Sequence, residues 1–340
     1  MRLKVSIGAI VVMAAAMTGE AYGDGMAQLS PGWREDYRRP ETIPYPDNNP
    51  WTSAKAQLGA TLFFDPVLSG SHTTACVNCH QPSLAWGDGL AKSVGDHSQT
   101  MNLRSPTLLN IAWLQRLGWD GKFPDVESVS FRAISGMANM DLPVQEALDR
   151  LQANPAYVRR FQAVFGPGSI TQQWVEQALA TYQRGIVSAP APFDHWVDSD
   201  ETAVSDAAKR GFAVFEGKAG CSGCHQGWAF TDGSFQDIGS ASGTDIGRGE
   251  LFPTSVMLHY AFKVPTLRDV ALRAPYMHDG SVPTLEAVID LYDRGGIVRP
   301  SRSPKIRPLG LTAAEKADLI SFLQTLTEDP QQVARPLPPR

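Results

Sequence analysis

The chain has 340 residues, with 30 Lys and Arg residues against 35 Asp and Glu residues and a net charge of −5. This balance, without a basic cluster, argues against binding to nucleic acid or to an anionic membrane surface, so proteins or small molecules are the expected partners. Four cysteines are too few to stabilise a chain of this length as a disulfide-rich scaffold.

The N-terminus has the features of an export signal. Arg2 and Lys4 precede an apolar run from Val5 to Met17, and small residues follow it. The run is too short to span a bilayer, and no later stretch is long and apolar enough, which predicts no membrane span in the mature protein. We expect residues 1–23 to be a cleaved signal peptide and the mature protein to be periplasmic.

Two elements are expected before the first chemical motif. Residues 24–50 are rich in proline and charge and are predicted to form an extended N-terminal arm on the surface. Ser53 can then cap a helix that ends near Phe63 and Phe64.

A Cys-x-x-Cys-His motif uses all four cysteines: its residues are Cys76, Cys79 and His80 in the first copy and Cys221, Cys224 and His225 in the second. This spacing is the attachment signature of c-type haem. The cysteines form thioethers to the haem, and the histidine binds iron as the proximal ligand. A zinc site made of the two cysteine pairs is the alternative, which the trailing histidines disfavour. Two copies predict two covalently bound haem c groups.

The segment after the first motif, residues 82–103, has no periodicity. It is predicted to be a loop that holds Trp86, His97 and Gln99 near one face of the first haem.

An internal repeat relates the two halves of the chain. Pro106 stands in Ser-Pro-Thr-Leu and Pro265 in Val-Pro-Thr-Leu, and Asp120 and Asp279 follow these prolines after the same interval. A helix with paired aromatic residues also precedes each haem motif. The two halves are therefore predicted to be related units.

The two halves differ at one position of this repeat. Thr284 can cap a helix whose apolar stripe includes Tyr292, and the repeat aligns Tyr292 with Ala133, which cannot bind iron. The repeat thus suggests Tyr292 as the distal ligand of the second haem and an open face at the first haem, where peroxide could bind. An ordinary core tyrosine is the alternative, and Met257 and Met277 are rival ligands.

The remaining periodic segments complete a mainly α fold. Residues 171–182 have helical spacing, and Thr312 and Glu315 form a capping box before a final helix. The Ala-Pro-Ala-Pro segment that ends at residue 192 is the predicted linker. We expect two cytochrome c-like domains with long loops between short helices, residues 51–192 with the peroxide-reacting haem and residues 193–340 with the second haem.

From about Tyr37 through Leu326 the chain resembles the MauG and bacterial di-haem cytochrome c peroxidase family. Besides the haem motifs, the resemblance rests on Phe64-Asp65-Pro66-Val67-Leu68-Ser69, Ser105-Pro106-Thr107, Trp119-Asp120-Gly121 and Ala274-Pro275-Tyr276-Met277-His278-Asp279-Gly280. It implies that the first haem reacts with peroxide and that Tyr292 is the distal ligand of the second. It also implies that Trp119 lies between the haems and passes oxidising equivalents, where an ordinary core indole is the alternative.

The resemblance implies a MauG-like di-haem enzyme. Such enzymes, including the MbnH type, use hydrogen peroxide to reach a high-valent two-iron state and oxidise tryptophan residues of a partner protein at long range. Family members of this kind build a tryptophan-derived quinone or convert a tryptophan of a copper-binding partner to kynurenine.

Two other functions are open. A cytochrome c peroxidase would reduce peroxide with electrons from a small carrier protein, and Tyr292 argues against it. A plain electron-transfer cytochrome would need a further ligand at the first haem, such as His97 or Met137.

The chain departs from the family at the peroxide-cleaving residues. Val129 and Asn139 stand where much of the family has glutamine and glutamate. A general acid or base must still reach the peroxide, which leaves His97, Gln99 and Asp141 as candidate catalytic residues.

Two further departures concern the ligand columns of the family. Asp96 takes the place of the histidine that blocks the first haem in resting peroxidases, with His97 next to it. Arg104 and Arg273 stand at positions where the family binds calcium. Because two guanidinium groups repel a cation, calcium is not expected, and the arginines are predicted to bridge haem propionates.

Overall fold

The structure is a computed structural model that describes residues 29–328 and residue 336. The predicted signal peptide, residues 1–23, lies outside the described residues. The α-helices are α2 (Trp33–Asp36), α3 (Ser53–Phe64), α4 (Cys76–Cys79), α5 (Glu127–Ile134), α6 (Val144–Ala153), α7 (Pro155–Phe165), α8 (Gln172–Arg184), α9 (Pro192–Val197), α10 (Asp206–Glu216), α11 (Leu285–Arg294) and α12 (Ala313–Gln324).

Short elements fill much of the chain between these helices. Strands β1 (Phe235–Gln236) and β2 (Phe262–Lys263) pair antiparallel. The 3-10 turns are η1 (Pro66–Leu68), η2 (Pro82–Leu84), η3 (Asp96–Ser98), η4 (Ile111–Trp113), η5 (Cys221–Gly223), η6 (Arg248–Glu250), η7 (Val256–Leu258) and η8 (Val270–Leu272). The prediction of a mainly α fold with long loops is confirmed.

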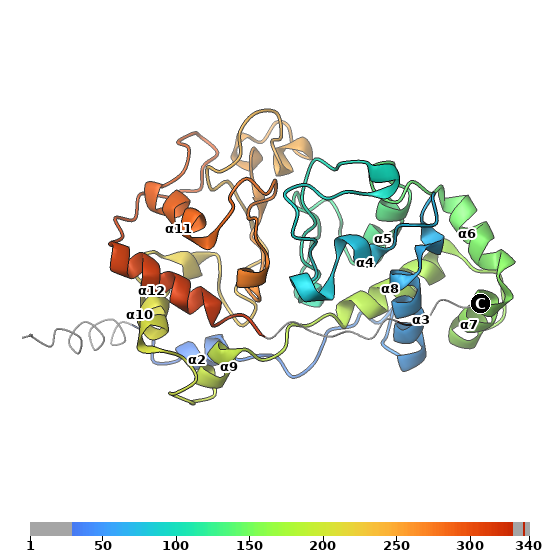
Figure 1. Ribbon diagram of the computed structural model, residues 1–340, viewed down its shortest axis with the longest axis horizontal. Helices are drawn as coiled ribbons and strands as arrows, with labels where there is room; N and C mark the ends of the chain where they lie inside the picture. Colours follow the sequence, from blue (N-terminus) through green and yellow to red (C-terminus); the bar gives the residue numbers. More distant parts are fainter. Residues whose placement is uncertain (1–28, 329–335, 337–340) are drawn as a thin grey trace, which may run out of the picture.

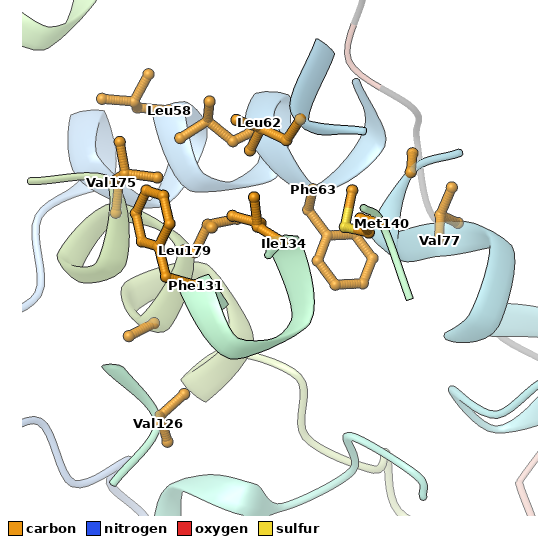
Figure 2. Close-up of a cluster of buried hydrophobic side chains, with 14 of the residues drawn as sticks. Leu58, Leu62, Phe63, Val77, Val126, Phe131, Ile134, Met140, Val175 and Leu179 are labelled. Atoms are coloured by element: carbon orange, nitrogen blue, oxygen red, sulfur yellow. The ribbon is translucent and has the colours of Figure 1, made fainter. Parts of the chain in front are cut away.

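Two hydrophobic clusters divide the described chain. One draws its buried residues from 58–186, and Figure 2 shows part of it between α3, α5 and α8. The other draws on 193–326 and on two residues of the N-terminal arm. Figure 1 shows the corresponding halves side by side, one from blue to green and the other from yellow to red. The predicted domain limits at residues 50 and 192 stay predictions, and the gap between the clusters supports the second.

The N-terminal arm is more than a surface segment. Its α2 helix carries Trp33, which is 8% exposed, and Tyr37, which is 3% exposed, follows the helix. Both rings pack against Phe193 and Phe212 in the second cluster. The prediction of an arm that only covers the surface is wrong for these residues, because distant aromatic side chains bury them.

Each half is built on one crossed helix pair, α3 with α8 and α10 with α12 (Figure 1). A glycine stands at each crossing, Gly59 on α3 and Gly211 on α10. A Cβ on Gly59 would collide with the carbonyl of Ala178, and one on Gly211 with the carbonyl of Asp318. Within each pair, the two helices therefore approach as closely as backbone atoms allow.

Helix caps follow the sequence patterns with one exception. The side chains of Thr284 and Thr312 accept backbone N–H bonds at the starts of α11 and α12, as predicted, and Thr171 does the same at the start of α8. Thr52, and not Ser53, caps α3 by accepting from the Lys55 N–H. Ser53 is the first residue of that helix.

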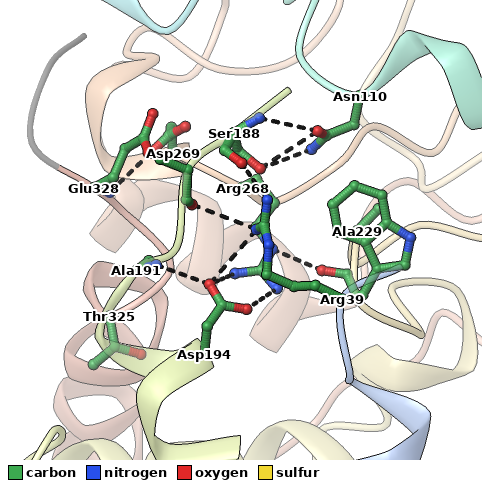
Figure 3. A network of polar contacts seen from close by, with 12 residues as sticks. Arg39, Asn110, Ser188, Ala191, Asp194, Ala229, Arg268, Asp269, Thr325 and Glu328 are labelled. Carbon is green, nitrogen blue, oxygen red and sulfur yellow. Dashed lines mark hydrogen bonds and ion pairs between the residues drawn. The ribbon is translucent and has the colours of Figure 1, made fainter. Parts of the chain in front are cut away.

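The linker between the halves is held by a buried ion pair. Arg268 is fully buried and donates two bonds of 2.7 Å to Asp194 of α9 and one of 2.7 Å to the carbonyl of Trp228. Asp194 also lies 3.6 Å from Arg39 of the arm, which donates to the carbonyl of Ser188. Figure 3 shows that this network joins the arm, the linker and the second half.

Candidate haem sites

The internal repeat reappears as matched hydrogen bonds. Thr107 donates from its hydroxyl to the carbonyl of Ala85 at 2.6 Å, and Thr266 donates in the same way to Ala229 at 2.6 Å. Each bond ties the loop after a haem motif to the Pro-Thr-Leu segment of that half. The repeat therefore sets the same frame around both motifs.

Each haem motif forms a single tight turn. Cys76–Cys79 is the short helix α4, and Cys221–Gly223 is the 3-10 turn η5. The N–H of His80 bonds to the carbonyl of Cys76 at 3.0 Å, and that of His225 to the carbonyl of Cys221 at 2.9 Å. All four thiols are free. Two thiols and one imidazole on one turn are the arrangement that haem c attachment requires.

Both motif histidines are oriented by a carbonyl group. Nδ1 of His80 lies 3.1 Å from the carbonyl oxygen of Trp86, and Nδ1 of His225 lies 2.9 Å from that of Phe230. Burial lowers the pKa of both imidazoles, which favours the neutral form that binds metal. A carbonyl acceptor at Nδ1 leaves Nε2 as the nitrogen for iron.

The second motif opens into a cavity that contains Tyr292. Cys221, Cys224, His225 and Tyr292 all line it. Burial and the nearby thiols raise the pKa of the Tyr292 phenol. The rest of the lining includes the apolar residues Phe215, Leu285, Val288, Ile289, Leu319 and Leu323. Two thiols, an imidazole and a phenol in one largely apolar cavity fit a covalently bound haem c, whose iron His225 and Tyr292 would hold.

The first motif has buried polar atoms without partners beside it. The indole Nε1 of Trp86 and the hydroxyl of Tyr182 make no hydrogen bond within the described chain, although both are buried. Tyr182 packs against Phe63, Phe64 and Trp86. Burial, and to a smaller extent the nearby Cys76, raise the pKa of its phenol. Unpartnered buried donors at this place fit a bound group that supplies acceptors, as haem propionates do. The sequence pattern identifies Tyr182 only as part of a helix.

Trp119 lies where the two halves meet. Its indole Nε1 donates to the carbonyl of Arg104 at 2.9 Å, and its own carbonyl accepts from the N–H of Lys263 at 2.8 Å. Although Trp119 belongs to the first half, it lines the cavity of the second motif. Its role between the two haems stays a prediction.

Arg104 and Arg273 lie together in the same cavity. Arg104 donates to the carbonyl of Arg273 at 2.9 Å, and Arg273 donates to that of Thr266 at 2.5 Å. Nε of Arg273 has no partner, neither guanidinium makes an ion pair within residues 29–328, and burial lowers the pKa of Arg273 to about 10. Such a pair fits a carboxylate, such as a haem propionate. The absence of calcium stays a prediction.

Two of the candidate acid–base residues, His97 and Gln99, lie on the loop after the first motif, and Asp141 lies between α5 and α6. Cys79 Sγ lies 3.7 Å from the carbonyl oxygen of Val94, which places this loop at the motif. Nε2 of His97 lies 3.9 Å from a carboxylate oxygen of Asp141 and 3.5 Å from one of Asp96. The structure thus brings His97 and Asp141 together. Gln99 is exposed on the same loop.

Asp96 has a structural role on this loop. Burial would raise its pKa, but hydrogen bonds from Ser71 and Thr74 outweigh burial and lower the pKa to about 2. Its carboxylate therefore holds the loop against the segment before the first motif.

Two cavity residues were not among the predicted site residues. Lys263 holds the repeat position of Arg104, and burial lowers its pKa to about 8. His278 holds the repeat position of Trp119, and its ring stacks on Phe262 with centroids 3.6 Å apart. The repeat, aligned residue by residue, is the signal that could have found both.

Comparison with known proteins agrees with this geometry. Residues 53–202 match the model of the di-haem cytochrome c peroxidase family, and residues 208–327 match that of cytochrome c. The methylamine utilization protein MauG of Methylorubrum extorquens is 43% identical over 331 residues, which are 97% of this chain and 94% of that protein. The chain belongs to the MauG and di-haem cytochrome c peroxidase family. As a member, it is a peroxidase-type oxidoreductase with two covalently bound haem c groups.

Two further relatives show both branches of the family. The cytochrome-c peroxidase IdrP1 of Denitromonas iodatirespirans is 34% identical over 360 residues, which cover 96% of this chain and 92% of that protein. A solved MauG-like protein associated with microbial copper homeostasis superposes with a TM-score of 0.80 at 29% identity, covering 86% of this chain and 96% of that one. Within residues 29–328 of the present chain, no helix is long and apolar enough to cross a membrane.

Proposed function

We propose that the protein uses hydrogen peroxide to oxidise tryptophan residues of a partner protein in the periplasm. Overall, one peroxide molecule takes two electrons and two protons from the substrate and becomes two molecules of water. The observation that carries the proposal is the place of Tyr292 in one cavity with Cys221, Cys224 and His225.

Tyr292 supports the tryptophan-oxidising branch of the family through the charge of its oxygen. Haem, when bound, supplies an iron that exchanges electrons with peroxide and with substrate. A phenolate is an anionic donor and stabilises the more oxidised iron, whereas a methionine ligand raises the reduction potential. A His225 and Tyr292 ligand pair therefore suits the storage of an oxidising equivalent better than electron uptake from a carrier.

Other residues of the chain have supporting roles. Trp119, fixed by its bond to the Arg104 carbonyl, would carry electrons between the two sites. His97, 3.9 Å from Asp141, would hold and move the protons of bound peroxide. Arg104 and Arg273 would bind propionates.

A second candidate function has one observation in its favour. Met277 lines the same cavity as Tyr292, and a methionine ligand would give the higher potential of a carrier-driven cytochrome c peroxidase. Met257 and Met137 are 59% and 80% exposed, which makes both poor ligands.

The test compares the wild-type holoenzyme with Tyr292→Met and with the matched control Tyr260→Phe. Paramagnetic resonance spectra are recorded before and after peroxide, and tryptophan oxidation in a protein encoded beside this chain is followed by mass spectrometry. We expect the wild type and the control to lose both ferric signals on peroxide and to oxidise tryptophan. We expect Tyr292→Met to lose tryptophan oxidation and to have a higher potential. A wild type that consumes peroxide with reduced cytochrome c but leaves tryptophan intact would contradict the proposal.

A further inference from the structure

One segment of the second half is strongly basic. Residues 294–307, called here the basic segment, contain five of the 30 Lys and Arg residues and none of the 35 Asp and Glu residues. Its cations are Arg294, Arg299, Arg302, Lys305 and Arg307. The net charge of −5 conceals this segment, because acidic residues elsewhere in the chain outweigh its five cations. Uncharged residues separate these cations along the sequence.

The basic segment is anchored to the rest of the second half. Arg299 makes two bonds of 2.7 and 2.6 Å to Asp237, and Ser301 donates to the same carboxylate at 2.7 Å. The N–H of Ser303 bonds to the Asp237 carbonyl at 2.9 Å, and that of Ile297 to the Gly239 carbonyl at 2.9 Å. A surface held in this way loses little freedom when it binds a partner.

Most of the charge on the basic segment is uncompensated. Among the described residues, Arg299 alone of its five cations makes an ion pair. Arg302 donates to the carbonyl of Gly295 at 2.7 Å, and Lys305 to that of Gly223 at 2.6 Å. Lys218 nearby is already paired with Glu315. The surface therefore offers free positive charge to an acidic partner.

The basic segment borders the cavity of the second haem motif. Lys305 and Arg307 line that cavity and are exposed. Gly223, to which Lys305 donates, stands between the two cysteines of the motif. A protein bound here would lie at the edge of the second haem site.

The segment also has an apolar centre. Ile297 is 46% exposed and Val298 is 79% exposed. An apolar core with a polar or charged rim is the usual anatomy of a protein–protein interface. Two aliphatic side chains are too few to insert into a bilayer, and the acidic remainder of the chain would repel nucleic acid.

We propose that residues 294–307 are the docking surface for the partner protein, and that the partner presents an acidic face with an apolar centre. The inference rests on the proposed function, since it brings the oxidised tryptophan to the edge of the second haem site. It adds the place of contact and the charge of the partner.

The test uses two synthetic peptides that each carry one tryptophan. One is rich in Asp and Glu, and the other has Asn and Gln in their place. Fluorescence anisotropy measures binding to the oxidised holoenzyme without peroxide, at low salt and at about 0.5 M salt, where charges are strongly screened. Mass spectrometry measures tryptophan oxidation with peroxide.

We expect the acidic peptide to bind at least about tenfold more tightly than the amide peptide at low salt, and the difference to vanish at high salt. Lys305→Glu with Arg307→Glu should abolish the difference. Arg294→Gln, which leaves the cavity lining untouched, should reduce it. The control Arg132→Glu with Arg159→Glu reverses two exposed cations of the first half and should retain it.

Equal binding of the two peptides would overturn the proposal, as would an equal loss in the control. Tighter binding to anionic phospholipid vesicles than to the acidic peptide would also overturn it. Selective binding without tryptophan oxidation would contradict the proposed function and leave the docking surface standing. Oxidation of both peptides at equal rates would overturn the docking surface and leave the proposed function standing.

Discussion

The backbone N–H of Lys263 donates a hydrogen bond of 2.8 Å to the carbonyl of Trp119. This bond joins the second half of the chain to the first at the cavity that contains Tyr292. Trp119 is thus held at the meeting point of the halves by both its backbone and its indole N–H.

Replacement of this indole tests the electron path between the sites. We expect Trp119→Phe to keep both haems and their resting spectra but to lower peroxide-dependent tryptophan oxidation by more than about tenfold, a rise in barrier above about 1.4 kcal/mol. Trp113→Phe, which alters an aromatic contact with Trp228, is the control. Equal rates in Trp119→Phe and wild type would show that Trp119 carries no electrons.

The buried pair of Arg268 and Asp194 should dominate the stability of the linker. Arg268→Met removes the two hydrogen bonds of 2.7 Å from the buried Asp194 carboxylate and leaves it with the more distant Arg39, so it should lower the free energy of unfolding by about 3–5 kcal/mol. The partly exposed pair of Lys218 and Glu315 gives the comparison, because Lys218→Met should cost about 0–1 kcal/mol. Denaturant unfolding of both variants measures the difference, and equal losses would refute the prediction.

The close helix crossings should not tolerate a side chain. Gly59→Ala and Gly211→Ala place a methyl group against a backbone carbonyl and should each destabilise the protein by about 1–3 kcal/mol or more. Gly32→Ala has open space around its Cβ position and is the matched control. Thermal unfolding followed by circular dichroism checks all three.

Asp96 should make stability depend on pH in the acid range. Its folded pKa, about 2, lies below its ordinary value of 3.8, so its contribution is full above about pH 4 and is lost as the pH falls towards 2. Asp96→Asn should remove this part of the pH dependence. The free energy of unfolding of wild type and Asp96→Asn, measured at several pH values from 2 to 7, tests the prediction. The same dependence on pH in both proteins between pH 4 and 2 would contradict it.

Removal of divalent cations tests the prediction that Arg104 and Arg273 prevent calcium from binding. We expect a chelator of calcium to leave the haem spectra and the peroxide reaction of the holoenzyme unchanged, because Arg104 and Arg273 bring positive charge to that place. Added calcium should likewise have no effect. Loss of activity on chelation, restored by calcium, would show that the cation binds despite the arginines.

Features that depend on neighbours in sequence were predictable. The cysteine motifs and the caps at Thr284 and Thr312 each involve residues a few positions apart, so their geometry is set locally. The error at Thr52 and Ser53 is a shift of one residue between adjacent hydroxyl side chains, both of which can cap a helix.

By itself, the sequence determined the haem c motifs, the two related helical halves and the difference between Tyr292 and Ala133, because each follows from residue type and spacing. Only the tertiary structure decided that Trp33 and Tyr37 enter the second core, and that Trp119 and Arg104 of the first half line the cavity of the second. Burial and the meeting of distant side chains depend on packing between remote segments, and no local pattern encodes that packing.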